Sequence, residues 1–246
     1  MVNRREILIG AAGVVAVAAP SISRAAESAS APGEAGNFIY DYLFVELLPG
    51  PGASSQTQFL AHLGDTVPGV RAAGGEAIGY FTPLIGWSSQ NFAILLRWKG
   101  GAPGRVEAVR ALGSHPIVSR VDRSRLAATV RPGPSDLPRT TGIYTHRWFE
   151  VKTGDITEFI DLSNRAWPYF EKEFPALVYG LFRAEASADD RSPGVTRMLL
   201  NTWYESHAVW EASRKPSSEP TAMFARRTQL TLTTRVASLH FTPLTA

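Results

Sequence analysis

The segment Gly142–Gly154, GIYTHRWFEVKTG, shows best how the 246-residue chain folds. It predicts a strand that runs into the start of a helix, and successive side chains of a strand point to opposite faces of its sheet. The first face carries Ile143, Thr145, Arg147, Phe149 and Val151. The second face carries the aromatic and ionisable side chains Tyr144, His146, Trp148 and Glu150. The first face can lie against helices if Arg147 is close to a strand end, whereas the second suits the wall of a pocket better than a dry core.

The composition describes a globular protein with a sizeable core, because 44% of the residues are hydrophobic and 19% are charged. Without the charges of the N-terminal 26 residues the net charge falls from +3 to +1. We therefore expect no basic stripe for nucleic acid. The chain has no cysteine, which excludes disulfides and thiolate chemistry.

Residues 1–26 have the pattern of an export leader. Arg4-Arg5 is followed by an apolar run from Ile7 to Ala19, which is too short for a mature membrane-spanning helix, and then by Pro20 and small residues around Arg24. The leader resembles a twin-arginine signal peptide, which predicts a periplasmic or secreted protein that is exported already folded. An ordinary secretory signal and an uncleaved anchor are the alternatives. Residues 27–37 form a small-residue linker.

The rest of the chain carries one pattern twice, over residues 38–131 and 141–246, separated by the proline-rich linker 132–140. Each copy has the order β-α-β-β-α-β. The first copy predicts strands over 38–48, 77–85, 92–98 and 125–130, with helices from residue 54 and over 105–112. The second copy predicts strands over 143–152, 177–184, 196–204 and 235–244, with helices over 155–173, 206–213 and 221–230. We expect Pro168 to kink or divide the helix that contains it.

Two such units predict an α+β fold of two tandem ferredoxin-like sheets, each covered by helices on one face. The simplest way to cover the bare faces is to turn them toward each other, which makes a barrel-like chamber inside one chain. The helix-facing side chains are then Leu43, Val45, Leu47, Phe149 and Val151. The side chains that face the inter-sheet chamber are Tyr40, Tyr42, Phe44, Glu46, Tyr144, His146, Trp148 and Glu150. We expect this chamber to be only partly filled by the protein's own side chains.

The second copy resembles the NIPSNAP family. The resemblance is carried by the strand Ile143–Gly154, by the run Arg197–Ser206 and by Trp210-Glu211-Ala212. It covers residues 141–246 well and 38–131 in outline, with Thr153 standing where the family usually has Pro. The resemblance implies the dimeric α/β barrel superfamily, which includes small monooxygenases, haem-binding enzymes and proteins without known activity, so it does not choose a function.

His146 and His240 are the first candidates for catalysis. The first and fourth strands of each unit are neighbours, so both histidines can open into the chamber and act as general acid or base, with Glu150 and Tyr144 beside them. A carboxylate among aromatic rings, such as Glu150 or Glu46, would have a raised pKa. The alternatives are histidines that are hydrogen-bonded at a sheet end and carboxylates at a wet rim.

The candidate substrate-binding residues are Tyr42, Phe44, Trp148, Arg183 and Arg197. The aromatic ones can hold an aromatic ligand or simply pack, and the two arginines can pair with a substrate carboxylate. Arg147 fits a structural role better than an anion contact. The sequence has no HExxH, P-loop or GxSxG motif and no closely spaced His/Asp cluster, so we predict no metal site and no cofactor.

The sequence predicts a protein that binds a small apolar or aromatic molecule between its sheets, with cofactor-independent acid–base or oxygenation chemistry as a possible activity. Whether it is an enzyme is left open. A non-enzymatic interaction or oligomerisation protein is the alternative, and a haem-binding protein with a histidine ligand is the third hypothesis. We expect no nucleic-acid partner, no membrane contact after signal cleavage, and a homo-oligomer as an open option. His146→Ala should abolish ligand binding or turnover and leave the melting temperature within a few degrees.

Overall fold

The described part of the chain is built from eight strands and six helical segments. The computed structural model describes residues 38–50, 54–100, 102–187, 192–215 and 218–244, which fall within one compact unit, Ala31–Ala246. The predicted leader 1–26 and linker 27–37 lie outside these residues. The strands are β1 (Phe38–Leu47), β2 (Gly75–Ile85), β3 (Asn91–Lys99), β4 (Val118–Ala128), β5 (Ile143–Lys152), β6 (Ala176–Ala184), β7 (Val195–Tyr204) and β8 (Thr231–Pro243). The helical segments are α1 (Ser54–Ala72), α2 (Arg105–Leu112), the single 3₁₀ turn η1 (Thr153–Asp155), α3 (Ile156–Glu173), α4 (His207–Ala212) and α5 (Ser218–Gln229).

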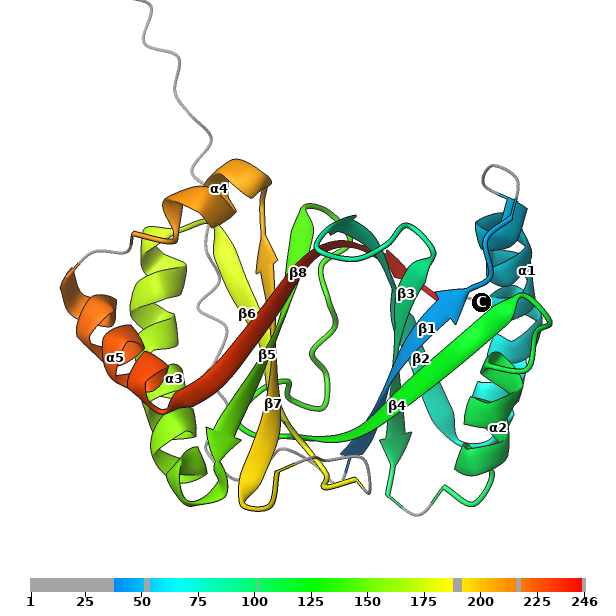
Figure 1. Cartoon of the computed structure of the whole chain (residues 1–246), viewed down its shortest axis with the longest axis horizontal. Coiled ribbons are helices and arrows are strands. Elements are labelled where there is room, and N and C mark those ends of the chain that lie inside the picture. The colour runs from blue at the N-terminus through cyan, green and yellow to red at the C-terminus, as the bar shows by residue number, and fades with distance from the viewer. Residues whose placement is uncertain (1–37, 51–53, 101, 188–191, 216–217, 245–246) are drawn as a thin grey trace, which may run out of the picture. The chain divides into compact units, whose positions relative to one another are not determined.

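The strands form one closed antiparallel barrel in the order β1-β3-β2-β8-β5-β7-β6-β4 (Figure 1). Strands β1–β4 form one ferredoxin-like unit and β5–β8 the second, as the sequence predicts. The two sheets are joined by pairing of β2 with β8 and by a short pairing of β4 with β6. Within each unit the first and fourth strands are neighbours, also as predicted.

The outer face of each sheet packs against its own helices. Leu43 and Val45 of β1 are buried with Phe59 and Leu63 of α1. Phe149 and Val151 of β5 are buried in a second cluster with α3. In Figure 1 the pair α1 and α2 and the pair α3 and α5 accordingly lie outside the barrel. No helix in the described ranges is long and apolar enough to cross a membrane.

Two local expectations differ from the structure. Helix α3 runs without a break from Ile156 to Glu173, so Pro168 does not divide it. Its buried face, which includes Phe159, Trp167 and Phe170, packs on the sheet and offsets the lost backbone hydrogen bond. Strand β4 begins at Val118 rather than at residue 125. The sequence does not show this earlier start, because the first half of the strand alternates only weakly and carries exposed charges such as Arg120.

The barrel interior is filled by side chains at its middle. Tyr40, Tyr144 and Phe81 are no more than 1% exposed. The ring centroids of Tyr40 and Phe182 lie 5.0 Å apart, and those of Phe81 and Tyr144 lie 5.5 Å apart. The predicted inward face of β1 and β5 is therefore confirmed, but the expectation of a partly empty chamber is wrong there, since an eight-stranded barrel is just wide enough for its side chains to fill.

Candidate functional site

His146 lies inside the barrel and is sealed on every side. It is 1% exposed, and its ring centroid is 4.3 Å from that of Phe81. Its Nδ1 is 2.8 Å from the Tyr42 hydroxyl oxygen, and the Asn201 amide nitrogen donates to its Nε2 at 3.0 Å. With Nε2 accepting, the ring proton of neutral His146 lies on Nδ1 and is donated to the Tyr42 oxygen. Both ring nitrogens are thus used within the protein.

Burial holds His146 in its neutral form. Desolvation lowers the pKa of its imidazole from 6.5 to about 3, because the charged form cannot be hydrated inside the barrel. Burial also raises the pKa of the Tyr42 phenol well above its usual range. The pair therefore carries no charge at neutral pH.

The buried imidazole makes stability depend on pH. Because the folded pKa of His146 is depressed, its contribution is fully present above the unfolded pKa of 6.5 and is lost as the pH falls toward about 3. As the pH falls from about 6 to 4, we expect protonation of His146 in the unfolded state to lower the free energy of unfolding by about 1.4 kcal/mol per pH unit. Urea denaturation of the wild type and of His146→Gln over this range isolates the contribution. Parallel pH profiles for the two proteins would contradict it.

The structure does not bring His146 and His240 together. His240 is exposed, whereas its neighbours Leu239 and Phe241 point into the barrel, so it lies on the outer face of β8. The residue of β8 opposite His146 is Ala237. Arg183 is likewise exposed, between the inward-pointing Phe182 and Ala184. The expectation that both histidines open into one chamber is therefore wrong, because the register places them on opposite faces of the barrel wall.

Other predicted site residues gather at one end of the interior. Trp148 packs edge-on against Tyr42 with ring centroids 5.5 Å apart, and the guanidinium of Arg197 lies 5.5 Å from the Trp148 ring. Phe44, Glu46 and Glu150 are half-buried on the same inward face. The Tyr144 hydroxyl donates to the Arg139 carbonyl oxygen at 3.0 Å. The catalytic or binding roles assigned to these residues stay predictions.

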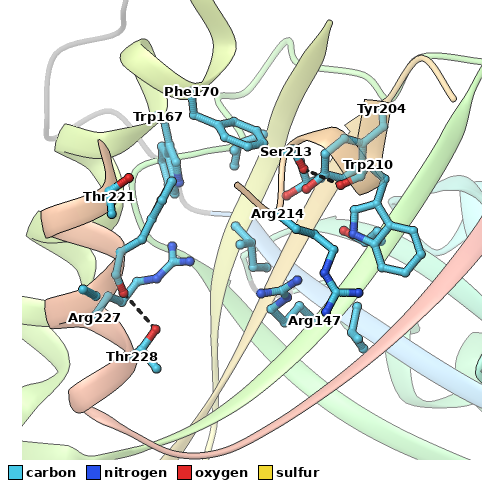
Figure 2. Close-up of a pocket in the computed structure, with 17 residues that line it drawn as sticks. Arg147, Trp167, Phe170, Tyr204, Trp210, Ser213, Arg214, Thr221, Arg227 and Thr228 are labelled. Carbon is cyan, nitrogen blue, oxygen red and sulfur yellow. Dashed lines mark hydrogen bonds between the residues drawn. The ribbon is translucent and has the colours of Figure 1, made fainter. Parts of the chain in front are cut away.

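A pocket lies outside the barrel, between the outer face of the second sheet and its helices (Figure 2). Its volume is about 510 Å³. Three kinds of side chain line it: arginines, hydroxyl-bearing residues, and aromatic or aliphatic residues. They are Thr145, Arg147, Trp167, Phe170, Val178, Leu200, Thr202, Tyr204, Trp210, Ser213, Arg214, Thr221, Phe224, Ala225, Arg227, Thr228 and Val236.

The sequence creates this pocket by placing polar side chains where the sheet faces its helices. Arg147 of β5 stands at the position that Leu43 occupies in β1, when the two first strands are aligned so that Tyr42 matches His146. Leu43 is fully buried under α1, whereas Arg147 borders the pocket and is half-buried. The second unit also has two helical pieces, α4 and α5, after β7 where the first unit has only α2. Side chains from both pieces form the pocket walls.

Arg227 is the most enclosed charge of the pocket. It is only 9% exposed, and it donates to the Ser163 hydroxyl at 3.3 Å. Its guanidinium lies 4.9 to 5.7 Å from the ring centroids of Phe149, Phe159 and Phe224. Burial, with the nearby charge of Arg147, lowers the pKa of Arg227 to about 10, so it remains protonated at neutral pH.

Arg147 and Arg214 add two further cations. Burial lowers the pKa of Arg147, and the charge of Arg214 acts in the same direction. Arg214 approaches Glu211 at 4.0 Å, but both side chains are largely exposed. Among the residues that the structure describes, no carboxylate lies within ion-pair distance of Arg147 or Arg227. The pocket thus combines uncompensated positive charge, hydroxyl groups and aromatic walls, which is the chemistry needed to hold an anion with an apolar body.

Sequence reasoning missed this pocket, although one signal pointed to it. Thr145 and Arg147 interrupt the helix-facing side of an otherwise apolar strand. A polar pair at such positions is compatible with a strand end, as the sequence predicts, and equally with a cavity beneath the helices. Arg227 and the two tryptophans come from helices and Arg214 from the turn after α4, and no local pattern connects them to β5.

Comparison with known proteins shows the fold and no closer relationship. No protein-family model matches the sequence, and no curated protein matches it. The chain is similar to an anthrone oxidase-like protein, with a TM-score of 0.56, 11% identity, and coverage of 85% of this chain and 93% of that one. It is similar to a heme-binding protein from Thermus thermophilus, with a TM-score of 0.51, 10% identity, and coverage of 84% and 92%. A mutant chlorite dismutase from Candidatus Nitrospira defluvii gives a TM-score of 0.52, 7% identity, and coverage of 85% and 92%. These similarities establish a dimeric α/β barrel type of fold made of ferredoxin-like units, while membership of the NIPSNAP family stays a prediction.

Proposed function

We propose that this protein binds a small anionic molecule with an apolar body in the pocket between β5, β7 and the helices α3, α4 and α5. The observation that carries the proposal is the buried guanidinium of Arg227, which faces Arg147 without a carboxylate partner in the described residues. A cation held out of water without a counter-ion is costly, and the cost falls when an anion enters. The pocket volume of about 510 Å³ is within the usual range for small-molecule sites.

This proposal moves the ligand from the chamber between the sheets to the outer side of the second sheet. The chamber residues His146, Tyr42 and Tyr144 are buried and bonded to one another or to the backbone, whereas the pocket offers free volume. Proteins of similar fold include a heme-binding protein and an anthrone oxidase-like protein, which supports small-molecule binding in general. We propose binding and assign no turnover to the pocket.

Haem does not fit the residues that line the pocket. An axial ligand to haem iron is usually a histidine, a cysteine or a methionine, less often a tyrosine. None of the first three is present in the described pocket lining, and burial raises the pKa of the Tyr204 phenol, which opposes the ionised form that binds iron. The buried His146 is in the barrel interior, on the other side of the sheet.

The leader adds a location to the proposal. Arg4-Arg5 and the apolar run after them support export by a twin-arginine route. We accordingly propose that the anion is bound outside the cytoplasm.

The proposal is tested with the aromatic sulfonate 8-anilinonaphthalene-1-sulfonate, whose fluorescence rises in apolar surroundings. We expect saturable binding to the full-length protein, and about tenfold or greater weakening in Arg147→Gln, since a hydrogen bond to a charged group contributes about 1.5–3 kcal/mol. Titration by fluorescence and by calorimetry measures both affinities.

Arg226→Gln is the matched control. Arg226 is adjacent to Arg227 in sequence, but it is exposed and pairs with Glu158 on the surface, so its loss should leave the affinity unchanged. Equal affinities of the wild type and Arg147→Gln would show that the probe binds elsewhere and would overturn the proposal.

A further inference from the structure

We propose that the ligand is a flat aromatic molecule that carries two negative charges. This inference rests on the proposed anion-binding function and specifies its ligand class. It follows from the number of cations that share the pocket and from the side chains that surround them.

The first observation is the charge balance of the lining. Arg147, Arg214 and Arg227 line the pocket, and the described lining residues include no aspartate or glutamate. Figure 2 shows the three arginines entering the pocket from different elements: Arg147 from β5, Arg214 from the segment after α4, and Arg227 from α5. The lining therefore has a formal charge that a single negative charge cannot balance.

The second observation is that the three cations affect one another. The charge of Arg214 lowers the pKa of Arg147 in addition to the larger effect of burial, and the charge of Arg147 does the same to Arg227. Such coupling requires proximity, and for the buried pair Arg147 and Arg227 it acts in surroundings that screen charge weakly, whereas Arg214 is largely exposed. A monoanion between Arg147 and Arg227 would interact with both but balance only one of the two charges. Two anionic groups on one ligand would compensate both.

The third observation is the shape and chemistry of the walls. Trp167 and Phe170 belong to α3, and Tyr204 and Trp210 lie toward β7 and α4 (Figure 2). Phe224 of α5 also lines the pocket. Aromatic side chains stack on flat rings, and guanidinium groups pair with carboxylate or phosphate groups through two parallel hydrogen bonds. Inorganic anions would leave the aromatic walls without a partner. An aromatic body with two carboxylate, sulfonate or phosphate groups satisfies walls and cations together.

The test compares two probes that share one ring system. Naphthalene-1,5-disulfonate and naphthalene-1-sulfonate are titrated into the full-length protein by calorimetry at constant ionic strength. We expect the disulfonate to bind about tenfold or more tightly, because each added charge-assisted contact contributes roughly one order of magnitude. In Arg147→Gln the ratio should fall below about threefold, because one of the two contacts is lost. Arg226→Gln should retain the wild-type ratio.

Each result has a separate meaning. Equal affinities for the two probes in the wild type, with both weakened in Arg147→Gln, would overturn the dianion inference and leave the anion-binding proposal intact. A preference for the disulfonate that persists unchanged in Arg147→Gln would also overturn the inference, because it would reflect general attraction to the protein surface. Binding of neither probe would overturn the proposed function itself.

Discussion

Arg227→Met should weaken binding of 8-anilinonaphthalene-1-sulfonate by about tenfold to a hundredfold without lowering the stability of the free protein. Methionine has a similar reach and can occupy the space beside Phe149, Phe159 and Phe224. The substitution removes three cation–π contacts, each worth about 0.5–2 kcal/mol, and also a desolvation penalty of several kcal/mol. Because the two effects nearly offset each other, we expect the free energy of unfolding to stay constant or to rise by about 1 kcal/mol.

Weaker probe binding together with an unchanged or raised stability distinguishes a binding site from a structural ion. Urea denaturation of the free protein measures the stability, and probe titration measures the affinity. Arg226→Met changes the neighbouring, exposed arginine to the same residue and should alter neither quantity appreciably. A large loss of stability in Arg227→Met would show instead that this arginine holds α5 on the sheet, and would contradict a primary role in binding.

His146→Ala should lower the free energy of unfolding by about 3–5 kcal/mol, because it leaves a cavity and removes the partners of two buried polar groups. The Tyr42 hydroxyl and the Asn201 amide would both lose their hydrogen bond to the imidazole inside the barrel. This reverses the expectation from sequence, which placed His146 on a pocket wall and predicted little change in melting temperature. Thermal and urea denaturation provide the measurement.

His240→Ala is the control for this substitution. His240 lies exposed on the outer face of β8, so its removal should change the stability by less than about 0.5 kcal/mol. Probe binding should persist in His146→Ala wherever the protein is folded, since the pocket lies on the other side of the sheet. A variant of His146 with wild-type stability would contradict the burial described for this side chain.

The fold could be predicted from the sequence because its elements are regular. The alternation in Ile143–Lys152 and the matching pattern in Phe38–Leu47 assign both faces of both first strands, and the barrel follows from covering the two bare faces. The start of β4 could not be predicted, because residues 118–125 are mostly exposed, with Val118 and Val121 only partly buried, and pairing with β1 rather than an apolar pattern makes them a strand. Pro168 does not divide α3 for a similar reason: the tertiary packing of α3 outweighs the local tendency of proline to break a helix.

The functional site could be predicted much less well, for a physical reason. The aromatic and ionisable inward face of β5 resembles a pocket wall by composition. Only the diameter of the barrel decides whether solvent or other side chains fill the space next to this face. The prediction that His146 and His240 lie side by side depended on a strand register that alternation along single strands does not specify. The pocket with Arg147 and Arg227 combines residues from a strand and from a helix much later in the chain, and its cavity exists only in three dimensions.

The closure of the barrel by the chain itself limits how copies of this protein can associate. Strand β2 is joined to β8, but β4 is joined to β6 only through Leu126, Ala127 and Ala128. Residues 118–124 of β4 pair with β1 and with no second strand in the described part of the chain, and the exposed charges of Arg120 and Asp122 at this edge discourage sheet extension. Backbone pairing between copies is therefore restricted to such short open edges, and it would leave the pairing within each barrel unchanged.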